Sequence, residues 1–364
     1  MNDEQNIKPF SARAHKGRGA TLNPKARFDR FDAAAFDDGW NTLALVNEEQ
    51  ARPKTEVSAD RSRTVIARNS SPDIPFTQSI NPYRGCEHGC IYCYARPSHA
   101  YLGLSPGLDF ETKLSAKHDA ATLLSKELAL PTYQCSPIAL GTNTDPYQPI
   151  ERQLKVTRRI VELLAKHHHP LTIVTKSAAV LRDLDLLKPM AEQNLVTVAL
   201  SITTLDPALA RVMEPRAAAP HRRLEAVEAL SDAGVPTVVM MAPVIPGLTD
   251  DEIEGIMEAV AERGAWQAYY TLLRMPHEIK DLFRDWLVNH FPLKADRVIS
   301  LHRQCRGGKL NDARFGHRMR GEGTYAELIR ERFKLAKKRF GTDRRMPRLR
   351  TDLFEVPGSQ LRLL

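Results

Sequence analysis

The sequence has no long apolar run. No stretch of about 18 or more apolar residues occurs, and the most apolar segment, VPTVVMMAPVIPGL at 235–248, contains three prolines. The N-terminal MNDEQNIKPF also lacks the basic and then apolar order of a secretory signal. The sequence therefore predicts a cytoplasmic protein without a membrane span.

Cysteine is scarce, with five residues in a chain of 364. A small, odd number does not suit a disulfide framework and indicates a reducing compartment. Three of the five are crowded in RGCEHGCIYCYARPSH at 84–99, where Cys86, Cys90 and Cys93 have the spacing C-x3-C-x2-C. Crowded thiols in a reduced protein favour metal binding.

Acidic residues are few in one region. Between residues 302 and 350 there are 16 Lys and Arg against 5 Asp and Glu, a net charge of +11, whereas the whole chain carries +8. Such a local excess suggests a polyanionic partner, possibly nucleic acid. A solvated helix face with a basic tail explains it equally well. The candidate phosphate contacts are Arg303, Arg306, Arg318, Arg320, Lys337, Lys338 and Arg339.

From about residue 75 onward, short apolar runs alternate with helical patterns. The expected strands are 77–83, 137–142, 171–176, 196–202, 236–243 and 268–274, and the expected helices are 112–129, 151–168, 178–192, 219–233, 250–263 and 277–290. Strands that are apolar on both faces are typical of a parallel sheet. Six β/α units are fewer than the eight of a closed barrel. We therefore expect an α/β fold with a partial (β/α)6 TIM-type barrel.

The chain divides into three expected parts. Residues 1–65 form a basic, largely irregular N-terminal extension, in which a short amphipathic piece at 31–45 could fold onto the body. Residues 66–299 form the barrel core, and 300–364 form a basic C-terminal extension. In that extension, a helix is expected with an apolar face made of Leu328, Ile329, Phe333, Leu335, Ala336 and Phe340.

Three clustered cysteines leave alternatives open. A structural zinc ion needs four protein ligands, and His88, Cys135 or Cys305 could supply the fourth. The spacing does not match the run of a ferredoxin-type cluster. Three thiolates can instead hold three irons of a 4Fe–4S cluster, which leaves one iron open for a cofactor or substrate.

The C-x3-C-x2-C spacing after a strand, with Tyr92 before the last cysteine, resembles the signature of the radical S-adenosylmethionine (SAM) enzymes. More narrowly, NPYRGCEHGCIYCYARPSH, LGTNTDPYQPIE, TIVTKS, ALSITTLD, MEPRAAAP and MAPVIPGLTD resemble the group related to spore photoproduct lyase, described as DNA repair photolyase-like. The resemblance covers roughly residues 60–350 and points to a bacterial subgroup whose substrate is not established.

The resemblance implies a 4Fe–4S cluster on Cys86, Cys90 and Cys93. It also implies reductive cleavage of SAM to a 5′-deoxyadenosyl radical, with flavodoxin or ferredoxin as reductant. The residues expected to bind SAM lie mostly at strand ends. The amino group is expected to contact Thr142, Asn143, Thr144 and Asp145, and the carboxylate Lys176 and Ser177; Arg216 could also bind the carboxylate, or it could pair with Glu214. The ribose is expected near Ser201 and Thr203, and adenine near Tyr92, Val244 and Ile245.

Three residues are candidates for hydrogen relay, namely Tyr94, Tyr147 and Cys305, although each could simply pack. The lyase proper uses a cysteine at the end of its second strand, and GTNTD here has none. A repair lyase acting on nucleic acid therefore stays open beside the same radical chemistry on a protein, peptide or small molecule. A non-enzymatic zinc or iron–sulfur module is the remaining alternative.

Overall fold

The computed structural model describes residues 17–29 and 54–358, so the amphipathic piece expected at 31–45 lies outside the described residues. Within them, the main sheet has the strand order β10-β9-β8-β7-β6-β3-β2. These strands are β2 (Ala67–Arg68), β3 (Gln78–Ile80), β6 (Ile138–Leu140), β7 (Leu171–Thr175), β8 (Val196–Ser201), β9 (Thr237–Val244) and β10 (Gln267–Leu272). Neighbours from β3 to β10 are parallel, and β2 pairs antiparallel with β3. The expected α/β fold with a mostly parallel sheet is confirmed, and the strand order is consistent with a partial barrel.

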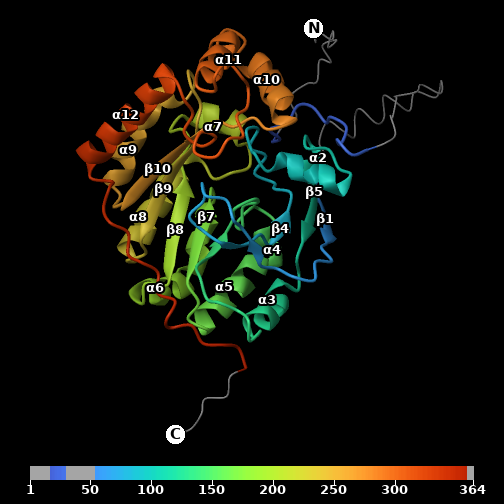
Figure 1. Cartoon of the computed structure of the whole chain (residues 1–364), viewed down its shortest axis with the longest axis vertical. Helices are drawn as coiled ribbons and strands as arrows, with labels where there is room; N and C mark the ends of the chain where they lie inside the picture. The colour runs from blue at the N-terminus through green and yellow to red at the C-terminus, as the bar shows by residue number, and fades with distance from the viewer. Residues whose placement is uncertain (1–16, 30–53, 359–364) are drawn as a thin grey trace, which may run out of the picture.

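Helices connect the parallel strands and cover the sheet (Figure 1). They include η1 (Arg96–Leu102), α2 (Asp109–Thr112), α3 (Ala120–Leu128), α4 (Glu151–Leu154), α5 (Val156–Lys166), η2 (Ala178–Asp183), α6 (Leu184–Glu192), α7 (Pro207–Met213), α8 (Pro220–Asp232), η3 (Asp250–Glu252) and α9 (Ile253–Ala261). After them come α10 (Ile279–His290), α11 (Ala295–Gln304) and α12 (Thr324–Phe340). No helix in this part of the chain is long and apolar enough to cross a membrane.

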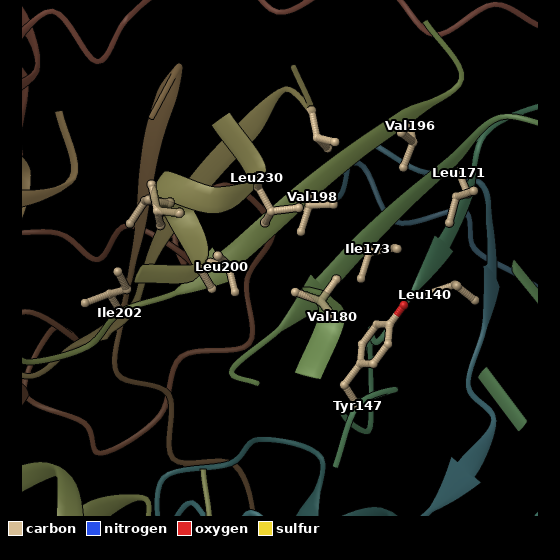
Figure 2. Packing of buried hydrophobic residues seen from close by; sticks show 14 of the residues in the cluster. Leu140, Tyr147, Leu171, Ile173, Val180, Val196, Val198, Leu200, Ile202 and Leu230 are labelled. Carbon is tan, nitrogen blue, oxygen red and sulfur yellow. The ribbon is translucent and has the colours of Figure 1, made fainter. Parts of the chain in front are cut away.

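The core lies between the sheet and its helices. Figure 2 shows Leu140, Ile173, Val198 and Leu200 from adjacent strands, together with Val180 and Leu230 from the helical layer. All six side chains are fully buried. Each buried side chain of this size contributes about 1.5–3 kcal/mol, which is why the apolar runs of the sequence identify the strands correctly.

One predicted helix is wrong in its first half. Residues 112–129 read as one helix, but Lys113–Ala116 form β5 and the helix α3 begins at Ala120. β5 pairs in parallel with β1 (Glu56–Ala59) and antiparallel with β4 (Tyr83–Arg84), which makes a second, three-stranded sheet. Pairing with β1, which precedes β5 by more than 50 residues, is a non-local interaction that a local helical pattern does not reveal.

The C-terminal helix α12 packs beside α9 on the outside of the sheet (Figure 1). Ile329, Phe333 and Ala336 face inward and are buried. Leu328 and Leu335, expected on the same apolar face, are instead 50% and 64% exposed. They are seven positions apart and therefore share a stripe of the helix that points to solvent.

The segment between α11 and α12 closes one side of the sheet. The N–H of Leu272 in β10 donates to the carbonyl of Met319 at 2.9 Å, and the N–H of Gly316 donates to Asp73 at 2.7 Å. Asp73 lies just before β3, at the other end of the parallel series. The segment therefore connects β10 to the region of β3.

Many basic residues of 302–350 have partners within the chain. Arg306 is buried on backbone carbonyls and does not reach solvent, so its expected contact with phosphate from outside is wrong. Other basic side chains are paired: Arg314 with Asp312 and Glu322, Arg318 with Asp73, Arg330 with Glu327, Arg332 with Glu254, Lys334 with Glu331 and Arg350 with Asp352. Arg303, Arg320, Lys338 and Arg339 are exposed.

Candidate functional site

The three clustered cysteines lie on a loop that directly follows β4 and adjoins the carboxyl end of β3. Gly85 and Gly89 have φ angles of +73° and +67°, which L residues rarely adopt. The N–H of Cys86 donates to the carbonyl of Phe110 at 2.9 Å, and the N–H of Ile91 donates to Met213 at 3.1 Å. The loop is therefore fixed by backbone contacts with α2 and α7.

A buried arginine holds the inner side of the loop. Arg96 is fully buried, and its guanidinium donates to the carbonyls of Cys90 at 2.9 Å and Gly89 at 3.0 Å. It also forms an ion pair with Glu111, which is buried as well. A fully buried guanidinium with these partners locks the backbone on which Cys90 is carried.

Part of the N-terminal extension packs on the same loop, next to α2 and α10 (Figure 1). The N–H groups of Gly19 and Ala20 donate to Glu111 at 3.0 and 2.8 Å. A Cβ atom on Gly19 would lie 1.8 Å from the carbonyl oxygen of Gly89, so this approach requires glycine. The sequence patterns predicted no role for this segment. Its glycines, in GRGA at 17–20, are nevertheless typical of places where two backbone segments approach closely.

The thiols sit close enough to affect one another electrostatically. Burial, followed by the negative charges of Asp145 and Cys90, raises the pKa of Cys86 well above its usual value. Burial and then Glu214 raise the pKa of Cys90 in the same direction. Metal ligation requires deprotonated thiols. A cationic iron group would supply the positive charge that these buried thiols need, so the donor set fits a cluster.

None of the candidates for a fourth protein ligand completes a metal site with the three cysteines in the described part of the chain. Cys135 lies at the amino end of β6. The cysteine loop lies at the carboxyl end of β3, which is parallel to β6, so the two are at opposite edges of the sheet. Cys305 is buried in the core that surrounds the sheet. His88 forms an ion pair with Asp145 at 3.3 Å through Nδ1. Across residues 17–29 and 54–358, no three His, Cys, Asp or Glu side chains gather as ligands of a single metal ion.

A buried polar network lies beneath the loop. Glu214 accepts hydrogen bonds from the hydroxyl groups of Tyr92 and Thr203 and from the guanidinium of Arg223. Arg223 also donates to the carbonyl of Ser201 at 3.0 Å. The expected alternative pairing of Glu214 with Arg216 is wrong, because Arg223 approaches from α8 and Arg216 pairs with Glu87 at 3.0 Å.

The segment GTNTD after β6 is held by its own contacts. Gly141 has a φ of +86°, and a Cβ there would lie 2.2 Å from the carbonyl oxygen of Val174. The Asn81 side chain accepts from the N–H of Asn143 at 2.8 Å and donates to the hydroxyl of Thr142 at 3.2 Å. The hydroxyl of Thr144 donates to the carbonyl of Tyr83 at 2.9 Å. Among the four predicted positions, the side chain of Asn143 is the exposed one.

Asp145 connects this segment to both neighbours. Its carboxylate accepts from the hydroxyl of Thr175 and the N–H of Lys176, both at 2.7 Å, besides pairing with His88. These hydrogen bonds and the charge of His88 lower its pKa, although burial opposes them. Both carboxylate oxygens are therefore already engaged, which assigns Asp145 a positioning role for the cysteine loop.

Lys176 extends from the carboxyl end of β7 toward the cysteine loop. Its ammonium lies 5.7 Å from the centroid of the Tyr92 ring. Burial lowers its pKa, and the negative charges of Cys90 and Cys93 oppose that effect. Within the described residues it forms no ion pair. A half-buried ammonium beside the thiols suits an anionic group of a bound molecule.

The remaining predicted SAM ligands are buried or already bonded. Ser177 caps η2 by accepting from the N–H of Ala179 at 3.2 Å. Ile245 and Tyr92 pack in the same apolar cluster as Cys90. Val244 ends β9, and its carbonyl accepts from the N–H of Leu273 at 3.0 Å.

The three hydrogen-relay candidates have different surroundings. Tyr94 is 48% exposed, and its hydroxyl donates to the carbonyl of Thr142. Tyr147 is buried, and its hydroxyl donates to Asp183 of η2 at 2.9 Å, in the helical layer. Cys305 is fully buried, and burial raises its pKa to about 11. Of the three, Tyr94 is the side chain that combines exposure with a place beside the cysteine loop.

A thiol-bearing loop at the carboxyl edge of a mostly parallel sheet defines an α/β protein whose thiol set fits a metal cluster. Residues 80–260 match the Radical SAM superfamily. The chain belongs to the radical SAM superfamily, as its sequence resemblance indicated.

Similar proteins extend over most of the chain. An uncharacterised protein of Mycobacterium tuberculosis (strain H37Rv) is 36% identical over 326 residues, which is 88% of this chain and 92% of that protein. One from Methanocaldococcus jannaschii is 30% identical over 199 residues, covering 55% of this chain and 71% of that protein. The solved structure of spore photoproduct lyase complexed with dinucleoside spore photoproduct has a TM-score of 0.56 at 14% identity, covering 87% of this chain and 86% of that chain. At this identity the similarity demonstrates a shared fold.

Proposed function

We propose that this chain is a radical SAM enzyme with a partial (β/α)6 barrel, a 4Fe–4S cluster and a nucleic-acid substrate. The observation that carries the proposal is the cysteine loop itself. Cys86, Cys90 and Cys93 lie on one fixed loop at the edge of the parallel sheet, and Lys176 points an ammonium without an ion-pair partner among the described residues toward them.

Different residues of this chain would bind the cluster and the parts of SAM. Cys86, Cys90 and Cys93 hold three irons, and Lys176 binds the carboxylate of SAM. Ile245 and Tyr92 pack with Cys90 in one apolar cluster, and the backbone of Ile245 would contact the adenine ring there. A cluster held by these thiols would supply the one electron for reductive cleavage of SAM and so the radical chemistry of the reaction.

Exclusion of water is the second task of the fold. The 5′-deoxyadenosyl radical must meet its substrate before other hydrogen donors reach it. The buried network around Glu214 satisfies its polar groups with Tyr92, Thr203 and Arg223. The base of the site is therefore rigid and its polar groups are satisfied by protein contacts.

Anaerobic reconstitution tests the proposal. The protein is loaded with iron and sulfide, reduced with dithionite, and given SAM, and 5′-deoxyadenosine is measured by chromatography. A variant with all three clustered cysteines changed to Ala is the control. Product from the wild type alone supports radical chemistry. A colourless protein that retains zinc and gives no product refutes it.

The substrate is tested separately from the chemistry. Formation of 5′-deoxyadenosine is compared with and without single-stranded DNA, and a several-fold increase is expected with DNA. A reduced flavodoxin or ferredoxin should replace dithionite as the electron donor. Acceleration by a protein, peptide or small metabolite in place of DNA would retain the radical chemistry and refute the nucleic-acid substrate.

A further inference from the structure

Three arginines gather where β10 ends, beside the cysteine loop. Arg306 is buried and donates to the carbonyls of Leu272 and Leu273 at 3.2 and 2.6 Å. The same guanidinium donates to the carbonyl of Arg318 at 2.8 Å. It thereby joins the end of β10 to the segment before α12. These hydrogen bonds of Arg306 bring Arg318 close to Arg274, the residue that follows Leu273.

Arg274 has few partners for a guanidinium. Its Nε is buried without a hydrogen-bond partner among the described residues. One terminal nitrogen lies 3.7 Å from the sulfur of Met319, which is a weak acceptor. Burial and then the charge of Arg318 lower its pKa. A buried donor without an acceptor is unfavourable, so this guanidinium is suited to an external acceptor.

The nearby carboxylate does not meet that need. Asp73 accepts from Arg318 and from the N–H of Gly316, and it forms its ion pair with Arg318. Arg274 forms no ion pair in residues 17–29 and 54–358. Asp73 forms its ion pair with Arg318, so the charge of Arg274 is not balanced by an ion pair within the described residues.

An aromatic ring borders these charges on the side of the cysteines. The guanidinium carbon of Arg274 lies 5.6 Å from the centroid of the Tyr94 ring. Tyr94 directly follows Cys93 and is 48% exposed, with its hydroxyl held by the carbonyl of Thr142. A molecule that contacts both Arg274 and this ring would lie next to the cysteine loop.

We propose that Arg274 and Arg318 bind a phosphate group of a nucleotide, and that the nucleotide's base lies against Tyr94. This inference rests on the proposed function and identifies a substrate site within it. The planar guanidinium matches two phosphate oxygens, and bases stack on exposed aromatic rings. SAM carries no phosphate, so a phosphate bound here would belong to a second molecule. Both a free nucleotide and a nucleic-acid strand present this chemistry.

Binding to the reconstituted, unreduced protein tests the site without any turnover. Fluorescence anisotropy is measured with a labelled oligothymidylate and with the same oligomer carrying neutral methylphosphonate linkages. Thymidine monophosphate and inorganic phosphate serve as competitors. The variants are Arg274→Gln, Arg274→Lys and, as a matched charge control, Arg222→Gln on the exposed face of α8, outside the basic 302–350 region. Thermal melting verifies that each variant is folded.

Arg274→Gln should weaken oligothymidylate binding about tenfold or more, whereas Arg222→Gln should weaken it less than about threefold. Arg274→Lys should restore part of the affinity. Wild type and Arg274→Gln should bind the methylphosphonate oligomer equally. Competition by the mononucleotide would assign the site to free nucleotides, and competition by oligomers alone would assign it to strands; either result supports a nucleotide phosphate.

Three results would overturn the site. These are equal losses in Arg274→Gln and Arg222→Gln, a loss in Arg274→Gln that persists with methylphosphonates, or weakened SAM binding in Arg274→Gln. The last result would assign the guanidinium to the SAM carboxylate. Because the assay requires no SAM cleavage, a failure to form 5′-deoxyadenosine would refute the proposed chemistry and leave the phosphate site to be judged by these binding data alone.

Discussion

Replacing Glu111 with Ala should destabilise the protein more than any single surface substitution. The Glu111 carboxylate is buried and accepts from Arg96 and from the N–H groups of Gly19 and Ala20. Its removal leaves the guanidinium of Arg96 buried and without its ionic partner. Breaking a buried pair in this way costs about 3–5 kcal/mol, a large part of the usual 5–15 kcal/mol of total stability.

The measurement is equilibrium unfolding in urea, followed by circular dichroism. Glu225→Ala is the matched control, because Glu225 also pairs with an arginine, Arg222, but both side chains are more than half exposed. Such a surface pair contributes at most about 1 kcal/mol. The free energies of unfolding of the two variants should therefore differ by about 2–4 kcal/mol.

A local effect should accompany the loss of stability. Arg96 also donates to the carbonyls of Cys90 and Gly89, so an unpaired guanidinium disturbs the loop that carries the cysteines. We expect Glu111→Ala to retain less iron than Glu225→Ala after reconstitution at a temperature where both are folded. Equal unfolding free energies in the two variants would refute the argument that this buried pair holds the loop.

Three further predictions concern other sites. Gly19→Ala should lose stability by about 1–3 kcal/mol, because its Cβ would meet the Gly89 carbonyl at 1.8 Å. Gly255 lies in α9, and a Cβ there would meet no atom within 4 Å, so Gly255→Ala should raise the free energy of unfolding by up to about 1 kcal/mol. A stabilised Gly19→Ala or a destabilised Gly255→Ala in urea unfolding would contradict the respective prediction. Burial lowers the pKa of His302 to about 4 in the folded protein. The unfolded chain, with a histidine pKa of about 6.5, therefore becomes protonated at a higher pH than the folded protein. The free energy of unfolding consequently decreases as the pH falls from about 6.5 toward 4. His302→Gln should reduce the loss between pH 7 and 5 by about 2 kcal/mol; an unchanged loss would exclude this histidine. Lys176→Met should weaken SAM binding about tenfold in calorimetry, and unaltered affinity would remove Lys176 from the SAM site.

Local sequence patterns were sufficient for much of the fold. The apolar runs 171–176 and 196–202 occur as β7 and β8, in which buried residues alternate with partly buried ones. The same patterns failed at 113–116, where strand β5 depends on β1. A local pattern reports the period of one segment, and it carries no information about a partner more than 50 residues away.

The sequence by itself determined the superfamily of the chain, because the spacing of three cysteines along one short segment is a local feature. Cys86, Cys90 and Cys93 therefore pointed to a cluster and to the superfamily before any fold was known.

Only the tertiary structure decided which charges serve the site. Folding pairs Glu214 with Arg223 and places Glu111 between Arg96 and the segment at Gly19. It also places Arg274 beside Tyr94 without an ion pair among the described residues. The physical reason is that the free energy of a charged side chain depends on burial and on partners that folding brings together from distant parts of the chain.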